Sequence, residues 1–142
     1  MKCSEVMTND PKVCLATDTV FQAAELMKSE DVGPIPIVSD RETRTLAGIV
    51  TDRDLVLHVM AEALDPKTTR VEDVMTALVA TCRSDDDAEK AIELMEKHQV
   101  RRIPIVDAEG KLIGIISQAD IATRLAQPAK TSEVVEEISQ AA

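Results

Sequence analysis

The chain has 142 residues, of which 44% are hydrophobic and 30% are charged, a composition ordinary for one compact domain or two very small ones. Its formal net charge of −10 disfavours nonspecific binding to DNA, RNA or an anionic membrane, and one Phe with no Tyr or Trp leaves no aromatic surface for stacking nucleic-acid bases. No apolar run approaches transmembrane length, and we recognise no signal peptide. Three cysteines without a framework spacing fit a reducing compartment, so we expect a cytoplasmic protein.

The first half of the chain alternates helical and strand patterns. Thr19 and Gln22 have the spacing of a capping box, which opens a helix. Pro36 lies near the start of an apolar strand and suggests an edge position for that strand, because proline cannot donate to a sheet ladder. The helix after Thr19 has these apolar residues at helical spacing on one face: Val20, Ala23, Ala24 and Met27. The predicted elements are a helical turn at 4–7, an extended run at 13–15, the helix from Thr19, strands at 35–38 and 46–50, and a helix from Thr51 that carries Leu55, Val56, Val59, Met60 and Ala63 on one side.

The second half repeats this order after a polar linker at 65–70. Asp87 caps a helix that directs Ala91, Ile92 and Met95 inward. The predicted elements are a helical turn at 71–75, a strand at 79–81, the helix from Asp87, strands at 103–106 and 111–116 joined by a turn, a helix from Ser117 that ends at Gln127-Pro128, and a further acidic helix at 131–140.

An internal repeat is the strongest signal in the sequence. Met7-Thr8 matches Met75-Thr76, and IPIV at 35–38 matches IPIV at 103–106, both at an offset of 68 residues. Each half therefore has the order β-α-β-β-α. Half of the chain alone would bury too little surface to be stable, so we expect the two sheets to pack face to face with pseudo-twofold symmetry.

Two related segments, GIVTDRDL at 48–55 and GIISQADI at 114–121, organise the two halves. Each places a hydroxyl where a strand meets a helix and a carboxylate three residues later: Thr51 with Asp54, and Ser117 with Asp120. One interpretation is a capping box that stabilises the helix start by about 1 kcal/mol. The other is a ligand site, because a helix N-terminus attracts anions, the hydroxyl can donate to a phosphate and the carboxylate can accept from a ribose diol.

The paired Met-Thr openings, the two IPIV strands and these two segments resemble a tandem pair of cystathionine-β-synthase (CBS) domains, also called a Bateman module. The resemblance covers roughly residues 5–127. Overall the chain is similar to small stand-alone two-CBS proteins of bacteria and archaea, including those of the hypoxic-response type.

The resemblance implies an adenosine ligand (AMP, ADP, ATP or S-adenosylmethionine) held in clefts between the repeats. It assigns the ribose hydroxyls to Asp54 and Asp120, and phosphate or ribose to Thr51 and Ser117. Further assignments come from the segments before the IPIV strands: Gly33, Pro34, Ile35, Arg102 and Ile103 for adenine, and Arg101 and Arg102 for phosphate. The first repeat has Gly33-Pro34 where the second has the arginine pair, which argues against two equal phosphate sites.

Two alternatives remain. The motifs could be caps in a non-catalytic dimerisation or scaffold protein. The cysteines and histidines could form a metal or redox site, although no C-x-x-C or close His pair supports one; these residues are Cys3, Cys14, Cys82, His58 and His98. No nucleophile–base pair or phosphate-binding glycine loop indicates an enzyme.

The sequence therefore predicts an α/β (α+β) protein with CBS repeats at 1–64 and 71–127, a linker at 65–70 and an acidic tail at 128–142. We expect a regulatory sensor of adenosine nucleotides or S-adenosylmethionine that requires no other cofactor and no metal. The resemblance further implies a homodimer that forms through the CBS helices. An unidentified effector protein on another chain would be its target, and we expect no nucleic-acid or membrane partner.

Overall fold

The computed structural model describes residues 1–77 and 79–124. These residues form two compact units, which we treat separately. The first-repeat unit is Lys12–Val79; the second-repeat unit combines Met1–Pro11 with the described residues from Ala80 onward. These units divide the chain differently from the predicted repeats, because residues 1–11 belong with the second repeat and residues 71–79 with the first. The predicted helix end at Gln127-Pro128, helix at 131–140 and tail at 128–142 lie outside the described residues.

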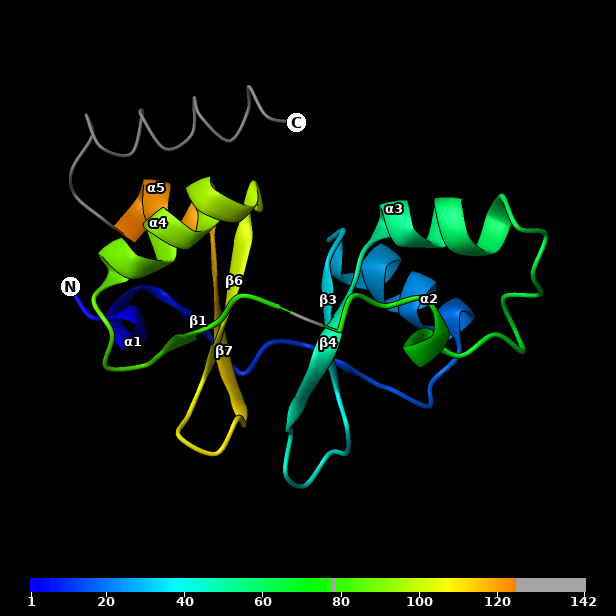
Figure 1. The fold of residues 1–142 in the computed structure, drawn as a ribbon, viewed down its shortest axis with the longest axis horizontal. Coiled ribbons are helices and arrows are strands. Elements are labelled where there is room, and N and C mark those ends of the chain that lie inside the picture. The colour runs from blue at the N-terminus through cyan, green and yellow to red at the C-terminus, as the bar shows by residue number, and fades with distance from the viewer. Residues whose placement is uncertain (78, 125–142) are drawn as a thin grey trace. The chain divides into compact units, whose positions relative to one another are not determined.

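The first-repeat unit is a three-stranded sheet with its helices (Figure 1). The strand order is β2-β3-β4, with β2 parallel and β4 antiparallel to β3. Its elements are β2 (Cys14–Leu15), α2 (Val20–Glu30), β3 (Ile35–Val38), β4 (Leu46–Val50), α3 (Asp52–Leu55), the π-helical turn η1 (Val56–Met60) and the 3-10 turn η2 (Val71–Asp73). The predicted capping box of α2 is confirmed, since Thr19 Oγ1 accepts from Gln22 N and Gln22 Oε1 accepts from Thr19 N.

The second-repeat unit has the same β-α-β-β-α order, preceded by one further short helix and one further strand (Figure 1). Its sheet order is β1-β7-β6-β5, with β5 parallel to β6 and the other pairs antiparallel. Its elements are α1 (Cys3–Val6), β1 (Thr8–Asn9), β5 (Cys82–Arg83), α4 (Ala88–His98), β6 (Arg102–Val106), β7 (Leu112–Ser117) and α5 (Gln118–Arg124). Asp87 caps α4 as predicted, and Ala91, Ile92 and Met95 are buried. Two sheets with matching helices confirm the predicted α/β repeat fold.

Each Met-Thr pair lies on the sheet of the repeat that it does not precede in the sequence. Thr8 stands before the first repeat in sequence but pairs with Ile115 of β7, in the second. Thr76 stands before the second repeat but bridges to Ile49 of β4, in the first. Each close approach requires a glycine: a Cβ at Gly48 would lie 2.5 Å from the Thr76 carbonyl oxygen, and a Cβ at Gly114 would overlap the Met7 sulfur.

Three local predictions are corrected. Pro36 does not mark an edge strand, because β3 is central in its sheet. Proline is tolerated there because β2 pairs only with Ile37 and Val38 and stops short of it. The predicted strand at 79–81 is instead β5, and Cys82 then pairs with Ile105 as Cys14 pairs with Ile37.

The third correction concerns the helix that Thr51 opens. After one α-helical turn it continues as the π-helical η1, whose wider turn breaks the 3.6-residue spacing that the prediction assumed. Of its predicted apolar side, Val59 is buried, whereas Val56 is 50% and Met60 is 75% exposed. That side is therefore not a core face of its own unit.

Candidate ligand-binding site

Both hydroxyl–carboxylate motifs form reciprocal caps at the start of a helix. In the second-repeat unit, Ser117 N donates to Asp120 Oδ2 at 2.9 Å and Asp120 N donates to Ser117 Oγ at 3.1 Å. In the first-repeat unit, Thr51 N donates to Asp54 Oδ2 at 2.9 Å and Asp54 N donates to Thr51 Oγ1 at 3.2 Å. The cap interpretation is thus correct as geometry. It does not exclude ligand binding, because each cap engages only one oxygen of its carboxylate.

The segment before each central strand is tied to the same helix start. Asp52 N donates to the Gly33 carbonyl at 3.2 Å, and Gln118 N donates to the Arg101 carbonyl at 2.9 Å. Within each unit the structure therefore brings the predicted adenine-contacting segment beside the predicted ribose and phosphate groups. Ile35 pairs with Val50 and Arg102 pairs with Ser117 across the sheets, which fixes this register.

The two candidate sites differ in charge. The second-repeat unit presents exposed Arg101 and half-buried Arg102 at the start of β6. The first-repeat unit has Gly33 at the position of Arg101, and the nearest neighbour of a Cβ there would be the carboxylate of Asp52, at 3.0 Å. Phosphate held near this segment would meet two guanidinium groups in one unit and an extra carboxylate in the other.

Sequence reasoning missed one neighbour of the motif, Thr8. Its Oγ1 lies 3.3 Å from Asp120 Oδ1 and 3.4 Å from Oδ2, and Asp120 is only 9% exposed. The repeated Met-Thr pair was the available signal. The contact itself joins residues 112 positions apart, and the sequence did not indicate that the opening of one repeat lies on the other.

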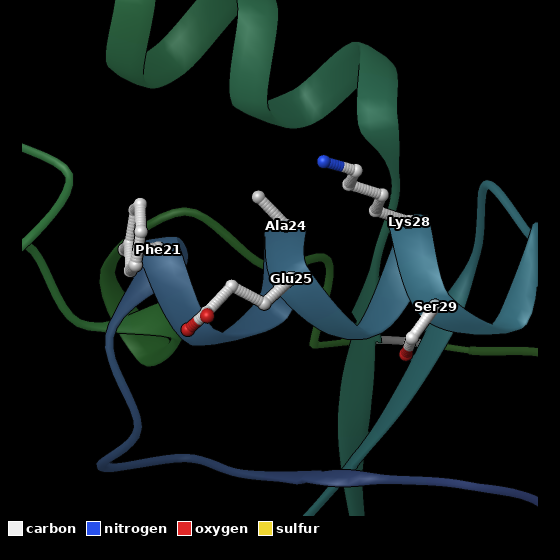
Figure 2. Close-up of a pocket in the computed structure, with 5 residues that line it drawn as sticks. All are labelled: Phe21, Ala24, Glu25, Lys28 and Ser29. Carbon is white, nitrogen blue, oxygen red and sulfur yellow. The ribbon is translucent and has the colours of Figure 1, made fainter.

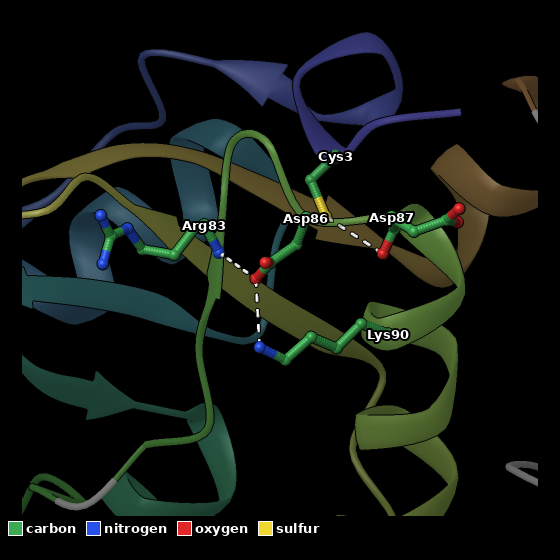
Figure 3. A network of polar contacts seen from close by, with 5 residues as sticks. All are labelled: Cys3, Arg83, Asp86, Asp87 and Lys90. Atoms are coloured by element: carbon green, nitrogen blue, oxygen red, sulfur yellow. Dashed lines mark hydrogen bonds and ion pairs between the residues drawn. The ribbon is translucent and has the colours of Figure 1, made fainter.

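A polar network surrounds the buried Cys3 (Figure 3). Its Sγ lies 3.8 Å from the carbonyl oxygen of Asp87. A hydrogen bond with the Cys82 thiol and burial raise the pKa of Cys3, and the same bond lowers the pKa of Cys82. Nearby, Asp86 Oδ2 accepts from Arg83 N at 2.8 Å and from Lys90 Nζ at 3.2 Å, and these bonds hold the pKa of Asp86 below its ordinary value.

The residues of the predicted metal or redox alternative divide between the units: Cys14 and His58 lie in one, and Cys3, Cys82 and His98 in the other. Among residues 1–77 and 79–124, no group of three or more His, Cys, Asp or Glu side chains could hold a metal ion. Burial raises the pKa of Cys14 to about 11.

A surface hollow of about 550 Å³ runs along α2 (Figure 2). Its lining residues all belong to this helix: Phe21, Ala24, Glu25, Lys28 and Ser29. None of the predicted ligand-binding residues lines it, so it is not the adenosine site. None of the described helices is both long and apolar enough to cross a membrane.

The two units share the order β-α-β-β-α and have the same cap at the start of the second helix in that order. This arrangement defines a tandem-repeat α/β protein. The chain belongs to the CBS domain family, whose sequence profile matches residues 3–61 and again residues 71–127. The predicted resemblance to a pair of CBS domains is thereby confirmed.

Individual relatives agree with this assignment. The uncharacterized protein YlbB of Bacillus subtilis is 36% identical over 139 residues, which are 98% of this chain and 92% of YlbB. The crystal structure of Hypoxic Response Protein I with two coordinated zinc ions has a TM-score of 0.78 and 31% identity, covering 86% of this chain and 97% of that one. The crystal structure of CBSX2 in complex with AMP has a TM-score of 0.74 and 28% identity, covering 91% and 98%.

Proposed function

We propose that this protein is a non-catalytic regulatory module that binds an adenosine-containing ligand: AMP, ADP, ATP or S-adenosylmethionine. The observation that carries the proposal is the pair of caps. In each, the backbone of the motif engages only Oδ2 of the aspartate, so acceptor capacity remains on the carboxylate, and the segment that would contact adenine is bonded to the same turn. The relative CBSX2, which shares the fold and 28% of its residues, was crystallised with AMP.

The proposed roles differ between the repeats. In the second, Asp120 accepts from the ribose hydroxyls, Ser117 contacts phosphate or ribose, and Arg101 and Arg102 balance the phosphate charge. Ile103 and the backbone of Arg102 contact adenine. In the first repeat, Thr51, Asp54, Gly33, Pro34 and Ile35 take the corresponding roles without an arginine pair.

Ligand binding regulates the module by shifting its population between two conformations. A ligand favours one conformation only as far as its affinities for two conformations differ. The arginine pair gives the second repeat a preference for phosphorylated ligands, so a nucleotide is the regulatory signal that we propose there. The downstream effector is another protein.

The test is thermal unfolding with AMP, ADP, ATP, S-adenosylmethionine and NADH, each added separately. A ligand at 100 times its Kd stabilises by about 2.7 kcal/mol, which raises the midpoint of a chain this size by roughly 10 °C. Asp54→Ala and Asp120→Ala should each remove part of the shift, and the double variant all of it. Glu109→Ala, which removes an exposed carboxylate outside both motifs, is the matched control and should keep the full shift.

Absence of a shift with every compound, in protein shown by mass spectrometry to carry no bound ligand, would reject the sensor. A shift that survives in the double Asp variant would reject these residues as the site. Metal analysis of protein purified without a tag tests the alternative: one zinc per chain would support a metal sensor instead.

We propose further that the module forms a homodimer through its helices. Apart from Met1 and Val100, the large hydrophobic side chains exposed among the described residues are Phe21 of α2, Val56, Leu57 and Met60 of η1, and Leu64 just after it. Lys67 Nζ lies 5.4 Å from the Phe21 ring centroid, which adds a cation–π contact beside them. Exposed apolar side chains gathered on neighbouring elements mark protein interfaces more often than scattered ones do, so we assign the dimer contact to this surface.

Sedimentation or light scattering tests this interface. Met60→Glu should convert a dimer to a monomer. Val100→Glu changes an exposed hydrophobic residue of the other unit in the same way and should leave the dimer intact. A dimer that survives Met60→Glu combined with Leu57→Glu would reject the helical interface.

A further inference from the structure

We propose that Thr8 is a positioning residue of the adenosine site in the second-repeat unit, so that this site is built from two segments far apart in the sequence. The proposal rests on the function proposed above and names a group that orients the ribose-binding carboxylate. Thr8 lies outside the GIISQADI motif and belongs, by sequence, to the opening of the other repeat.

The argument begins with the carboxylate of Asp120. Its Oδ2 accepts from Ser117 N at 2.9 Å, and Thr8 Oγ1 lies within 3.3–3.4 Å of both oxygens. The backbone N–H of Ser117 and the hydroxyl of Thr8 therefore both contact the Asp120 carboxylate and hold it in one orientation. A carboxylate has about four lone-pair positions, so a ribose diol still finds acceptors beside these two donors. Thr8 thus restricts the rotation of the carboxylate without blocking it.

Thr8 is itself held on both sides. It pairs with Ile115 of β7, the strand that leads into the motif. On its other side, Arg124 Nη1 donates to the carbonyl oxygens of Val6 at 2.7 Å and Met7 at 2.6 Å. Arg124 follows Asp120 by one turn of α5, so one helix carries both the carboxylate and the side chain that secures the segment with Thr8.

The first-repeat unit supplies the internal comparison. Thr76 bridges to Ile49, the register position that Thr8 occupies on Ile115. Yet among the described residues Asp54 has its cap bonds and no bond from Thr76, and it is half-buried. Two motifs that look alike in sequence therefore differ in one contact. Both carboxylates are held by a backbone N–H of their cap, but the Asp120 carboxylate has the Thr8 hydroxyl as a second donor, which restricts it further before the ligand arrives and favours binding at Asp120.

The experiment measures AMP binding by calorimetry, one site at a time. In an Asp54→Ala background, which leaves the second-repeat site, Thr8→Val should weaken AMP binding by about tenfold, because binding must then order a carboxylate that the Thr8 hydroxyl no longer holds. Thr8→Ser keeps the hydroxyl and should stay within about twofold of the background. In an Asp120→Ala background, Thr76→Val is the matched control and should leave AMP affinity unchanged.

A structural effect is separated from a positioning effect in two ways. Thr8→Val is expected to lower the thermal midpoint without AMP by a few degrees relative to Thr8→Ser, because it removes a donor to the buried Asp120 carboxylate, so AMP affinity is measured at 25 °C, where both variants are folded. Thr8→Ala replaces Thr8→Val if valine disturbs the strand. In an Asp120→Asn background that still binds AMP weakly, Thr8→Val should have little further effect, because the oriented charge is already gone.

Three outcomes would overturn the proposal. Thr8→Val with unchanged AMP affinity rejects it while the adenosine site stands. Equal losses of AMP affinity in Thr8→Val and Thr76→Val, each in its own background, reject the proposal that only the second-repeat carboxylate is held by a threonine. Equal losses in Thr8→Val and Thr8→Ser show that the hydroxyl is not the reason. Failure of the proposed function looks different: AMP and the other adenosine compounds would not bind the unaltered protein at all.

Discussion

Arg124 donates from one nitrogen to the Met7 carbonyl oxygen at 2.6 Å, across 117 positions of sequence. The same nitrogen reaches the Val6 carbonyl at 2.7 Å. This side chain ties the start of the chain to the last described helix.

Arg124→Ala should loosen residues 1–11 without unfolding the unit. Two charge-assisted bonds to carbonyl groups that are only partly buried contribute about 1–2 kcal/mol together. Amide hydrogen exchange should therefore accelerate at Thr8 and Asn9, which pair with β7, more than in β6. His58→Ala changes the equivalent position of the first repeat and serves as the control, with no expected change in exchange at β1. Equal acceleration throughout the sheet would contradict this local role.

Gly48→Ala should destabilise the first-repeat unit by about 1–3 kcal/mol, the usual range for an overpacked site. The new Cβ would lie 2.5 Å from the backbone oxygen of Thr76, which cannot rotate away, so the bridge between Thr76 and Ile49 must open. Gly33→Ala is the matched control. Its Cβ would approach the mobile end of the Asp52 side chain at 3.0 Å, and we expect a loss below about 1 kcal/mol. Urea unfolding monitored by circular dichroism measures the stability of both variants. Equal losses of stability in Gly48→Ala and Gly33→Ala would reject the steric explanation.

Cys14 should react slowly with thiol reagents in the folded protein. Burial raises its pKa to about 11, from an ordinary value near 9, so little thiolate forms at pH 8. Because the folded pKa is the higher one, this neutral thiol contributes stability that is complete below pH 9 and is lost as the pH rises through 11.

Labelling with a chromogenic disulfide at pH 8 checks this expectation. Cys14 in a Cys3→Ser, Cys82→Ser background should react only at the rate of unfolding, and it should react at once in 6 M guanidinium. Rapid labelling of the native protein would show that the thiol is not buried in solution.

Asp86→Asn should make the free energy of unfolding depend less on pH in the acid range. The bond from Arg83 N and the contact with Lys90 lower the pKa of Asp86, so its stabilising effect is present above its ordinary value near 4 and disappears as the pH falls through the lowered one. The unfolding midpoints of Asp86→Asn and of the unaltered protein, measured between pH 2 and pH 6, should therefore converge as the pH approaches 2. Asp85→Asn, which alters an exposed neighbour, is the control and should reproduce the unaltered profile. A constant difference between Asp86→Asn and the unaltered protein across this range would reject the assignment.

Much of the secondary structure was predictable because it follows from local rules. The capping boxes at Thr19, Thr51 and Ser117 form as expected, since their partners are three residues away. The IPIV strands likewise follow from short-range pattern. Pro36 misled the edge assignment because the length of the neighbouring strand β2 is not encoded near the proline. The π-helical turn at Val56–Met60 had no local signal that we recognised.

The sequence by itself determined the repeat, the family and the four capping residues of the two motifs, because all of these depend on residue identity at short and regular spacing. Only the tertiary structure decided which opening segment lies on which repeat, that Thr8 meets Asp120 whereas Thr76 does not meet Asp54 among the described residues, and which glycines permit these approaches. The physical reason is that such pairings are made between distant parts of the chain, by strand register and side-chain volume, and two copies of one motif can then acquire different neighbours.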